Sequence, residues 1–381
     1  MPKNILFVTG TRADFGKLKP LISRVAASKE FEYRIFATGM HMQSKYGATI
    51  NEIVNAGFEN IHPFINQDAV GSTGMDLALA NTIQGLGHFV REFTADLIVV
   101  HGDRIEALAG ATVGALHNIL VAHIEGGEVS GTVDELLRHA ISKLSHIHFV
   151  ASEEARNRLL QMGEQPNTIF VIGSPDIDVM LSESLPSLEE VKSHYEIPFE
   201  DYCIFIYHPV TTELAGAEER AREMWEALSA SKRHFVVIHP NNDSGSEILL
   251  REMLSHAGNP HFRCLPSMRF ESFLTLLKHS TAIVGNSSAG IREAPVYGVP
   301  TINIGTRQLN RFNHSSIHNV PDDRNAILEV LRNVPPPSDP SHHFGDGNSA
   351  ERFMDCVRSN SLWKIGKQKQ FQDIVVEPVA R

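Results

Sequence analysis

Two acidic residues directly follow apolar segments of the chain and are the first candidates for chemistry. Asp103 comes in HGD after DLIVV (96–100), and Glu125 comes in EGGE after ILVAHI (119–124). The two apolar segments predict buried strands of a parallel sheet. Ligands of such sheets collect at the carboxyl ends of the strands, so both carboxylates are expected to face one crevice.

A third carboxylate follows closely in the sequence. Asp134 lies in VDELLR, the first turn of a predicted helix that Ser130 or Thr132 could cap. Acidic residues are common in first turns, but Asp134 stands out because it is so near Glu125. Crowded carboxylates repel each other, so at least one is expected to have a raised pKa and to stay protonated near neutral pH. The nearby histidines, expected to orient these carboxylates rather than transfer protons, are His101, His123 and His139.

The N-terminal segment of the chain predicts a strand, a loop and a helix. NILFVTG (4–10) is an apolar run, and in the following segment, TRADFGKLKPLISRVAAS, apolar residues recur at helical spacing. The loop places Arg12 and Lys17 beside a helix N-terminus, which suits an anionic oxygen. It lacks the GxGxxG of dinucleotide sites, which disfavours NAD.

The second half of the chain predicts a phosphate site. TAIVGNSSAGIREAPVYG contains a strand and the loop GNSSAG (285–290), which opens a predicted helix. Its hydroxyl and backbone N–H groups could hold phosphate without a Walker lysine. Glu293 on that helix could accept hydrogen bonds from two ribose hydroxyls, and Arg307 adds a cation. Two further predicted strands end at His208 and His239.

Composition limits the class of protein. A chain of 381 residues suits two domains, and a net charge of −11 argues against a nucleic-acid or anionic-membrane surface. A small-molecule partner is therefore expected. The three widely spaced cysteines fit reduced thiols, and no signal peptide or membrane-spanning run is evident, so a cytoplasmic location is predicted. His146 and His148 could share one face of a strand, but no matching ligand pair exists and zinc is disfavoured.

These patterns together predict an α/β protein with a GT-B-like fold, in which two Rossmann-like domains have parallel sheets facing a central cleft. Residues 1–180 form the N-terminal domain with the carboxylates, and residues 181–350 form the C-terminal domain that binds the nucleotide. The polar segment 183–202 is expected to be a linker. Residues 351–381 form a C-terminal helix, capped by Ser349, and a tail that packs back on the N-terminal domain.

Seven motifs carry a family resemblance. In this order and spacing the chain resembles the hydrolysing UDP-N-acetylglucosamine 2-epimerases of sialic acid biosynthesis, over residues 3 to about 310; the motifs are GTRADFGKL, HGDR, HIEGGEVSGT, RHAISKLSHIH, HPVTTE, GNSSAGIREAP and GTRQ. Non-hydrolysing relatives carry other residues in place of EGGEVSGT and HPVTTE. The resemblance implies a homo-oligomer, either a dimer or a tetramer, and no metal or organic cofactor.

The resemblance also implies roles for individual residues. Asp103, Glu125 and Asp134 match the catalytic carboxylates, while Asp178 and His208 match residues near the reacting sugar. The positions expected to hold UDP are Arg12, Arg104, His208, Asn241, Ser267, Met268, Ser287, Ser288, Gly290, Glu293 and Arg307. The match weakens between residues 247 and 268, where this chain has Glu247 in place of a lysine of the animal enzyme, and beyond residue 310.

Several carboxylates suit the chemistry that the resemblance implies. The hydrogen on C2 of the sugar is not acidic until the bond from C1 to UDP breaks through an oxocarbenium-like state. One carboxylate then stabilises the positive centre while another removes the proton, which gives 2-acetamidoglucal, and water adds to form N-acetylmannosamine. Glu125 is the preferred base. Arg12, Arg307 and the GNSSAG helix start would stabilise the leaving diphosphate.

Three alternatives remain at this point. The same reaction could act on UDP-2,4-diacetamido-2,4,6-trideoxyglucose of the legionaminic acid pathway, because the pocket for C4 and C6 of the sugar is not visible in the sequence. A GT-B glycosyltransferase would use the same nucleotide site but seldom needs so many acids in one crevice. A binding protein without catalysis would not explain Asp103, Glu125 and Asp134 together.

Overall fold

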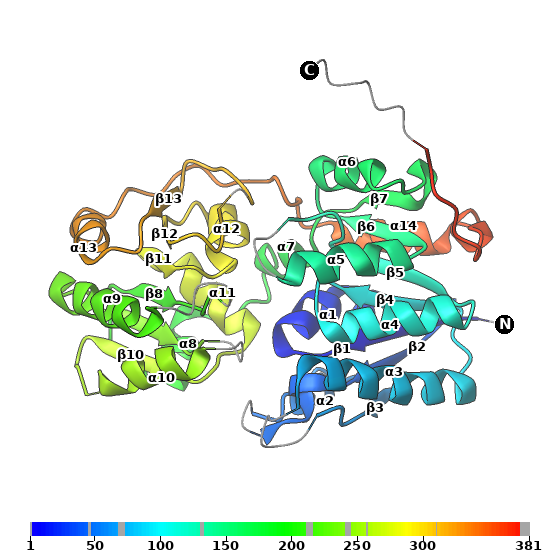
Figure 1. Ribbon diagram of the computed structural model, residues 1–381, viewed down its shortest axis with the longest axis horizontal. Coiled ribbons are helices and arrows are strands. Elements are labelled where there is room, and N and C mark those ends of the chain that lie inside the picture. Colours follow the sequence, from blue (N-terminus) through cyan, green and yellow to red (C-terminus); the bar gives the residue numbers. More distant parts are fainter. Residues whose placement is uncertain are drawn as a thin grey trace, which may run out of the picture. The chain divides into compact units, whose positions relative to one another are not determined.

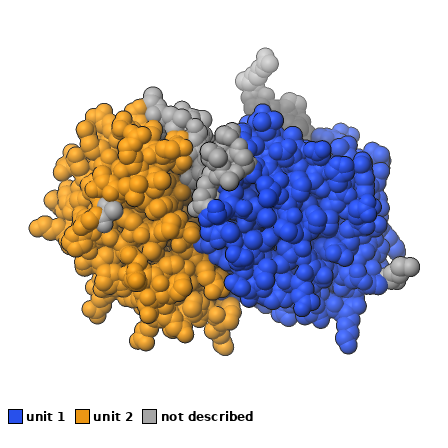
Figure 2. Space-filling model, turned by 90° about the horizontal axis from the view of Figure 1, so that it is seen from below, with its two compact units in different colours: residues 1–128, 133–181, 343–381 blue, residues 129–132, 182–342 orange. Residues whose placement is uncertain are grey.

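The chain divides into two compact units in the computed structural model, which describes residues 2–44, 47–67, 73–129, 133–210, 216–240, 245–256, 258–309 and 311–373. Unit 1 comprises residues 1–128, 133–181 and 343–381, and unit 2 comprises residues 129–132 and 182–342 (Figure 2). Unit 1 is therefore discontinuous in sequence, because its last segment follows the whole of unit 2.

Unit 1 is built on a seven-stranded parallel sheet (Figure 1). Its strands are β1 (Lys3–Thr9), β2 (Phe31–Ala37), β3 (Ile61–Pro63), β4 (Leu97–His101), β5 (Leu120–Ile124), β6 (Ile147–Val150) and β7 (Ile169–Val171). Its helices are α1 (Arg12–Ala26), α2 (Ile50–Asn55), α3 (Met75–Glu92), α4 (Ile105–Leu116), α5 (Val133–Leu144), α6 (Glu153–Gln161), α7 (Pro175–Met180) and α14 (Ser349–Arg358), with the 3-10 turns η1 (Gly39–Met42), η3 (Pro166–Thr168) and η5 (Leu362–Lys364).

Both faces of this sheet are covered, which explains why its strands are apolar throughout. Alternate residues of β1 enter different cores: Ile5 and Phe7 pack with α1 and α14, whereas Leu6 and Val8 pack with α3, α4 and α5. Helix α14, from the end of the chain, contributes Phe353 to the same core as Ile5. Residues from the two ends of the sequence thus complete one face of the sheet.

Unit 2 is built on a six-stranded parallel sheet. Its strands are β8 (Cys203–Ile206), β9 (Phe235–Ile238), β10 (Phe262–Leu265), β11 (Ala282–Gly285), β12 (Thr301–Ile304) and β13 (Ile317–Val320). Its helices are α8 (Leu188–His194), α9 (Ala217–Ser231), α10 (Ser246–Ser255), α11 (Phe270–Lys278), α12 (Ala289–Arg292) and α13 (Arg324–Arg332), with the 3-10 turn η4 (Ala294–Tyr297).

The core of unit 2 is formed on one face by β8 residues and by α9, α10 and α13. Phe205 packs there with the fully buried Trp225 of α9 and with Leu331 of α13. The expected linker 183–202 is not a linker throughout, because it contains α8, which begins with a capping box of Ser187 and Glu190. The serine and the glutamate three residues later were the signal for this helix.

The six strands of the unit 2 sheet have the same order as the first six strands of the unit 1 sheet, which has β7 in addition. The order is β3-β2-β1-β4-β5-β6-β7 in unit 1 and β10-β9-β8-β11-β12-β13 in unit 2, with every pair parallel. This confirms the predicted α/β class with two Rossmann-like parallel sheets. In each sheet the strand order reverses at one point, which lies between β1 and β4 in unit 1 and between β8 and β11 in unit 2. Ligands of such sheets bind at the loops of this switch point.

Candidate active site

The turn that carries Asp103 is held by a neutral histidine. Gly102 follows β4 with φ of +71°, and its carbonyl accepts a hydrogen bond from Nε2 of His123 on β5 at 2.7 Å. Burial lowers the pKa of His123 to about 3, so the ring is neutral and its Nδ1 accepts from the Ser142 hydroxyl at 3.0 Å. His123 therefore holds the turn that precedes Asp103, and its expected role of orienting a carboxylate stays a prediction.

Glu125 is buried in an unusual backbone conformation. Its φ is +61° and the residue is 3% exposed. Non-glycine residues seldom adopt this region, and active sites are among the places where such strained residues are found. The Ser174 hydroxyl donates a hydrogen bond to Oε1, while His101 Nε2 lies 3.2 Å and Lys17 Nζ 3.8 Å from Oε2. Two cations thus face a carboxylate that water barely reaches.

Arg138 of α5 connects the first two predicted carboxylates. The guanidinium is 4% exposed; Nη1 donates to the Glu125 carbonyl oxygen at 2.8 Å, and Nη2 donates to Asp103 Oδ2. Asp134 lies four residues before Arg138 on the same helix, a spacing that puts both on one helix face. The predicted caps Ser130 and Thr132 lie outside the described residues. Sequence reasoning missed Arg138, whose only signal was a basic residue among the inward positions of an amphipathic helix.

His101 joins Glu125 to a carboxylate that sequence reasoning also missed. Its Nδ1 lies 2.8 Å from Asp14 Oδ1, on the first turn of α1. Burial alone would lower the pKa of His101, but the carboxylates of Glu125 and Asp14 raise it to about 9. The ring is therefore a cation at neutral pH.

The two cations predicted for anion binding contact carboxylates in this structure. Lys17 Nζ lies 2.9 Å from Oδ2 of Asp176, which is buried on α7, and Arg12 Nη2 lies 2.7 Å from Glu52 Oε1. Arg104 precedes α4, and its Nε lies 3.5 Å from Glu106 Oε2. These contacts are within unit 1.

Asp178 is engaged with the C-terminal helix. Its two carboxylate oxygens accept hydrogen bonds from the backbone N–H groups of Ser349 (2.8 Å) and Ala350 (2.7 Å), the first residues of α14. Burial raises the pKa of the Asp178 carboxyl, and these N–H groups offset the rise in part. The predicted capping by Ser349 is wrong: Asn348 precedes the helix and Asp178 satisfies its N–H groups. The contact of Asp178 with sugar stays a prediction.

In unit 2, His208 and Asn286 bridge the switch point between β8 and β11. The His208 N–H donates to Asn286 Oδ1 at 2.7 Å, and Asn286 Nδ2 donates to the His208 carbonyl at 2.8 Å. Gly285 has φ of +126°, and a Cβ there would lie 2.0 Å from the Ile206 carbonyl oxygen, so only glycine fits. Burial, and then the charge of Arg307, lower the pKa of His208 to about 3.

The helix predicted after GNSSAG is much shorter than expected. Helix α12 covers one turn, Ala289–Arg292, and continues as the 3-10 turn η4, in which Pro295 removes a backbone donor. Few peptide dipoles are therefore aligned, so anion binding at this loop depends on individual N–H groups and side chains. Arg307 Nη1 and Gln308 Nε2 both donate to the Asn286 carbonyl, at 3.2 and 3.0 Å, and hold the loop after β12 against it.

The remaining residues predicted for UDP binding have diverse surroundings. Ser287 and Ser288 are half-buried in the loop before α12, and Glu293 directly after that helix is 5% exposed. Gly290 is required for packing, because a Cβ there would lie 2.6 Å from Thr301 Cγ2. Ser267 is exposed and Met268 buried between β10 and α11, whereas Asn241 lies outside the described residues.

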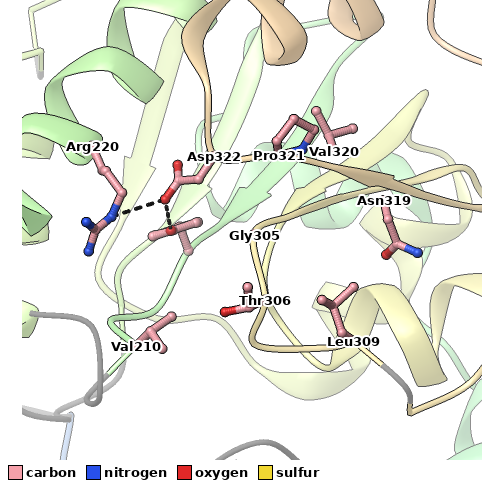
Figure 3. Close-up of a pocket in the computed structure, with 10 residues that line it drawn as sticks. Val210, Arg220, Gly305, Thr306, Leu309, Asn319, Val320, Pro321 and Asp322 are labelled. Atoms are coloured by element: carbon pink, nitrogen blue, oxygen red, sulfur yellow. Dashed lines mark hydrogen bonds and ion pairs between the residues drawn. The ribbon is translucent and has the colours of Figure 1, made fainter.

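A cavity of about 350 Å³ opens at the carboxyl ends of β8, β12 and β13 (Figure 3). Asp322 lies at its wall, where its Oδ2 accepts from the Tyr207 hydroxyl at 3.1 Å and lies 3.3 Å from Arg220 Nε. Tyr207 and Thr306 both line the cavity. Tyr207 directly precedes His208 in the sequence, and Thr306 directly precedes Arg307. The loops that carry two predicted site residues therefore also border an open space.

A second buried carboxylate in unit 1 has a different environment. Glu164 is 1% exposed and lies 2.9 Å from His148 Nε2, 2.7 Å from Lys143 Nζ and 2.6 Å from Lys369 Nζ. Burial alone would raise the pKa of Glu164, but these neighbours hold it at about 2. Burial lowers the pKa of His148, which is a hydrogen-bond partner of Glu164. No group of acidic, histidine and cysteine residues in the described part of the chain could hold a metal ion.

None of the described helices is long and apolar enough to cross a membrane.

Comparison with known proteins places the chain among sugar-nucleotide epimerases. A family profile described as UDP-N-acetylglucosamine 2-epimerase matches residues 23–358. A protein of Neisseria meningitidis serogroup B named UDP-N-acetylglucosamine 2-epimerase is 47% identical, over 98% of this chain and 99% of its own. The UDP-N,N'-diacetylbacillosamine 2-epimerase (hydrolyzing) of Legionella pneumophila is 35% identical, over 95% and 97% of the two chains.

A third relative and a solved structure agree with these matches. The polysialic acid biosynthesis protein P7 of Escherichia coli is 35% identical, over 94% of this chain and 89% of its own. The crystal structure of the UDP-GlcNAc 2-epimerase of Methanocaldococcus jannaschii, in complex with UDP-GlcNAc and UDP, covers 93% of this chain and 99% of its own with a TM-score of 0.78 and 21% identity. That likeness concerns the fold and confirms the predicted GT-B-like class.

Proposed function

This chain belongs to the UDP-N-acetylglucosamine 2-epimerase family, and we propose that it is a hydrolysing member that converts UDP-N-acetylglucosamine and water to N-acetylmannosamine and UDP in sialic acid biosynthesis. The observation that carries this function is the cluster around Glu125. Arg138 contacts Asp103 and the Glu125 backbone together, at the carboxyl ends of β4 and β5. Carboxylates held this way suit an elimination followed by a hydration.

The first step breaks the bond between C1 of the sugar and the UDP oxygen, and UDP leaves with both bonding electrons. The positive charge that develops on C1 acidifies the hydrogen on C2. Glu125 accepts this proton, and the two electrons of the broken C2–H bond form the C1–C2 double bond of 2-acetamidoglucal. In this assignment Asp103 stabilises the positive centre, while Asp134 supplies a further carboxyl from the same face of α5 as Arg138.

The second step adds water across the double bond. A second, protonated carboxyl delivers a proton that comes from solvent to the opposite face of C2, which gives the manno configuration, and water adds to C1 as hydroxide. Glu125 is suited to the first step, because its Oε2 lies near two cations that stabilise the carboxylate before it takes the proton. The proton that Glu125 took from C2 passes to solvent, the remaining proton of water recharges the second carboxyl, and UDP leaves with the electrons of the C1–O bond.

Unit 2 holds the leaving group in this proposal. Arg307 and the N–H groups of the loop 285–290 stabilise the diphosphate, Ser287 and Ser288 add hydroxyl donors, and Glu293 accepts from the ribose hydroxyls. His208 is neutral in this structure, so it would contact the substrate as a hydrogen-bonding group rather than as a cation. Arg12, Arg104, Asn241, Ser267 and Met268 complete the proposed contacts with UDP.

One experiment tests the function directly. The protein is incubated with UDP-N-acetylglucosamine in deuterated water, and the products are analysed by mass spectrometry and NMR. We expect UDP and N-acetylmannosamine with one deuterium at C2. UDP-N-acetylmannosamine as the final product would instead indicate a non-hydrolysing epimerase, and the Glu125→Gln variant serves as the inactive control.

A parallel incubation addresses the alternative substrate. The 35% identical relative from Legionella acts, by its name, on UDP-N,N'-diacetylbacillosamine, whereas the 47% identical relative from Neisseria is named for UDP-N-acetylglucosamine. The higher identity over the full length favours UDP-N-acetylglucosamine here. Turnover of the 2,4-diacetamido-trideoxy sugar nucleotide alone would overturn that choice.

The same proposal includes a cytoplasmic location and a homo-oligomer, a dimer or a tetramer. Light scattering of the purified full-length chain, coupled to size-exclusion chromatography, tests the second point. A mass equal to one chain of 42.2 kDa at working concentration would contradict it.

A further inference from the structure

His101 stands between two carboxylates that come from different parts of unit 1. Its Nδ1 lies 2.8 Å from Asp14 Oδ1 on α1, and its Nε2 lies 3.2 Å from Glu125 Oε2 after β5. The side chains are nearly shut off from water, since those of His101 and Asp14 are 10% exposed and that of Glu125 is 4% exposed. Asp14, His101 and Glu125 are called here the buried triad.

The geometry of the buried triad favours a charged ring. Nδ1 of His101 is within hydrogen-bond distance of Asp14 Oδ1, and Nε2 is in ion-pair contact with Glu125 Oε2. A neutral imidazole has one N–H donor, so its other nitrogen would place a lone pair against a carboxylate oxygen. The pKa of His101, raised to about 9 by the carboxylates of Glu125 and Asp14, agrees with a charged ring.

The far end of the triad is fixed in place. Asp14 Oδ2 accepts a hydrogen bond from the Gly10 N–H at 3.0 Å, and the Asp14 N–H donates to the Thr11 side chain at 3.2 Å, which caps α1. Asp14 is therefore attached to both the end of β1 and the start of α1. A cation held by such a carboxylate cannot follow Glu125 if that side chain moves, so it defines where Oε2 lies.

Other titratable or charged groups surround the triad and affect its titration, the neutral His123 among them. They are Lys17 on α1, Asp103 after β4, His123 on β5, Arg138 on α5 and Asp176 on α7. Lys17 is shared between Glu125 and Asp176, and Arg138 is engaged with Asp103, so neither cation is devoted to Glu125. His101 is 3.2 Å from Glu125 Oε2, closer than Lys17 at 3.8 Å.

We propose that Asp14 and His101 are positioning residues for the reaction: the imidazolium, anchored by Asp14, aims Oε2 of Glu125 and balances its charge until Glu125 takes the proton of C2 in the elimination. This inference rests on the proposed function. His101 keeps its own protons throughout, so in the elimination the proton passes from C2 to Glu125 alone. The ion pair is lost when Glu125 is protonated and restored when Glu125 releases that proton to solvent, while another carboxyl protonates the opposite face of C2.

The test compares His101→Gln and Asp14→Asn with the wild type in the full chain. Glutamine can donate only from the nitrogen of its amide and carries no charge, so it cannot serve both carboxylates, and we expect kcat to fall by about 100-fold with little change in KM. The acid limb of the kcat pH profile should move to higher pH, because Glu125 loses a neighbouring cation. In Asp14→Asn the imidazolium is less stable, so the alkaline limb should move to lower pH.

A matched control is available in the same unit. His148 is also a buried histidine paired with a buried carboxylate, Glu164, at 2.9 Å. We expect His148→Gln to lower the melting temperature but leave both limbs of the pH profile in place. If His101→Gln and Asp14→Asn likewise lower only the melting temperature, the positioning role is overturned.

A readout without activity separates this inference from the proposed function. NMR titration of histidine-labelled protein should show that His101 stays charged up to pH 8 in the wild type. In Asp14→Asn the ring should lose its charge at a lower pH than in the wild type. A neutral His101 at pH 7 in the wild type overturns the inference, even if the enzyme is active. Failure of the wild type to process UDP-N-acetylglucosamine, with His101 still charged, overturns the proposed function instead, and with it the role of the triad.

Discussion

The switch points of the two sheets offer the same backbone location but carry opposite kinds of chemistry. In unit 1, the residues that join β4 to α1 are an imidazolium and a carboxylate, His101 and Asp14. In unit 2, β8 and β11 are joined by hydrogen bonds between the backbone of His208 and the side-chain amide of Asn286, and neither group is charged. The topology provides a place for a ligand in both units, and the difference in local residues is the basis of our proposal that one place moves protons and the other binds an anion.

Loss of the proposed base should distinguish the roles of the two switch points most clearly, because it should lower turnover and leave UDP binding intact. Glu125→Gln keeps the size of the side chain but cannot accept a proton, so we expect kcat to fall by about 1000-fold. The affinity for UDP, measured by isothermal titration calorimetry, should stay within about twofold because the proposed UDP contacts lie mainly in unit 2. Equal losses of turnover and of UDP affinity would contradict this division.

Glu164 is the structural counterpart of Glu125 in the same unit. Glu164→Gln leaves Lys143 and Lys369 without their buried partner, and we expect it to cost about 3 kcal/mol of unfolding free energy with normal kcat. Because the folded pKa of about 2 lies below the ordinary value of 4.5, the wild type has this stability above pH 4.5 and loses it as the pH falls towards 2. Urea unfolding at several pH values measures both effects; a variant with the acid sensitivity of the wild type would refute the assignment.

Arg307 probes the anion site of unit 2. Replacing it by methionine removes a guanidinium near the loop 285–290, and we expect UDP to bind about 10- to 100-fold more weakly. The pH limbs of kcat, set by unit 1 in this proposal, should not move. Arg324→Met, an exposed arginine of unit 2 paired with Glu226, is the control and should leave the dissociation constant unchanged.

Asp178 gives the smallest expected effect and decides between two roles. Asp178 accepts hydrogen bonds from the first N–H groups of α14. If that is its role, Asp178→Asn should lower the free energy of unfolding by about 1 kcal/mol. Thermal unfolding and kcat are measured on the same preparation. A fall in kcat of more than about 10-fold, with the melting temperature unchanged, would favour the contact with the sugar that the family resemblance implies.

The strands and the acidic residues at their ends could be predicted because those features are local. DLIVV and ILVAHI are buried on both faces of the sheet, and Asp103 and Glu125 follow them directly. The partners of these carboxylates could not be predicted, because they arrive from distant elements: Asp14 lies 87 residues from His101, and Arg138 lies 35 residues from Asp103. The three-residue strand β3 was missed because its apolar signal is too short.

The helix after GNSSAG was overestimated for a related reason. The loop opens a helix as predicted, but Pro295 has no backbone N–H, and the α-helix ends at Arg292 and continues as a 3-10 turn. Periodicity reports which residues face inward, and it does not report where the backbone hydrogen bonds stop.

The discontinuity of unit 1 has a consequence for how the protein is made. Phe353 of α14 shares a core with Ile5 of β1, so the first strand to leave the ribosome waits for one of the last segments to be translated. Residues 182–342 emerge as an uninterrupted stretch and can assemble during synthesis. Unit 2 can therefore complete its core before unit 1 does, and a chain that ends before α14 lacks part of the core that covers β1.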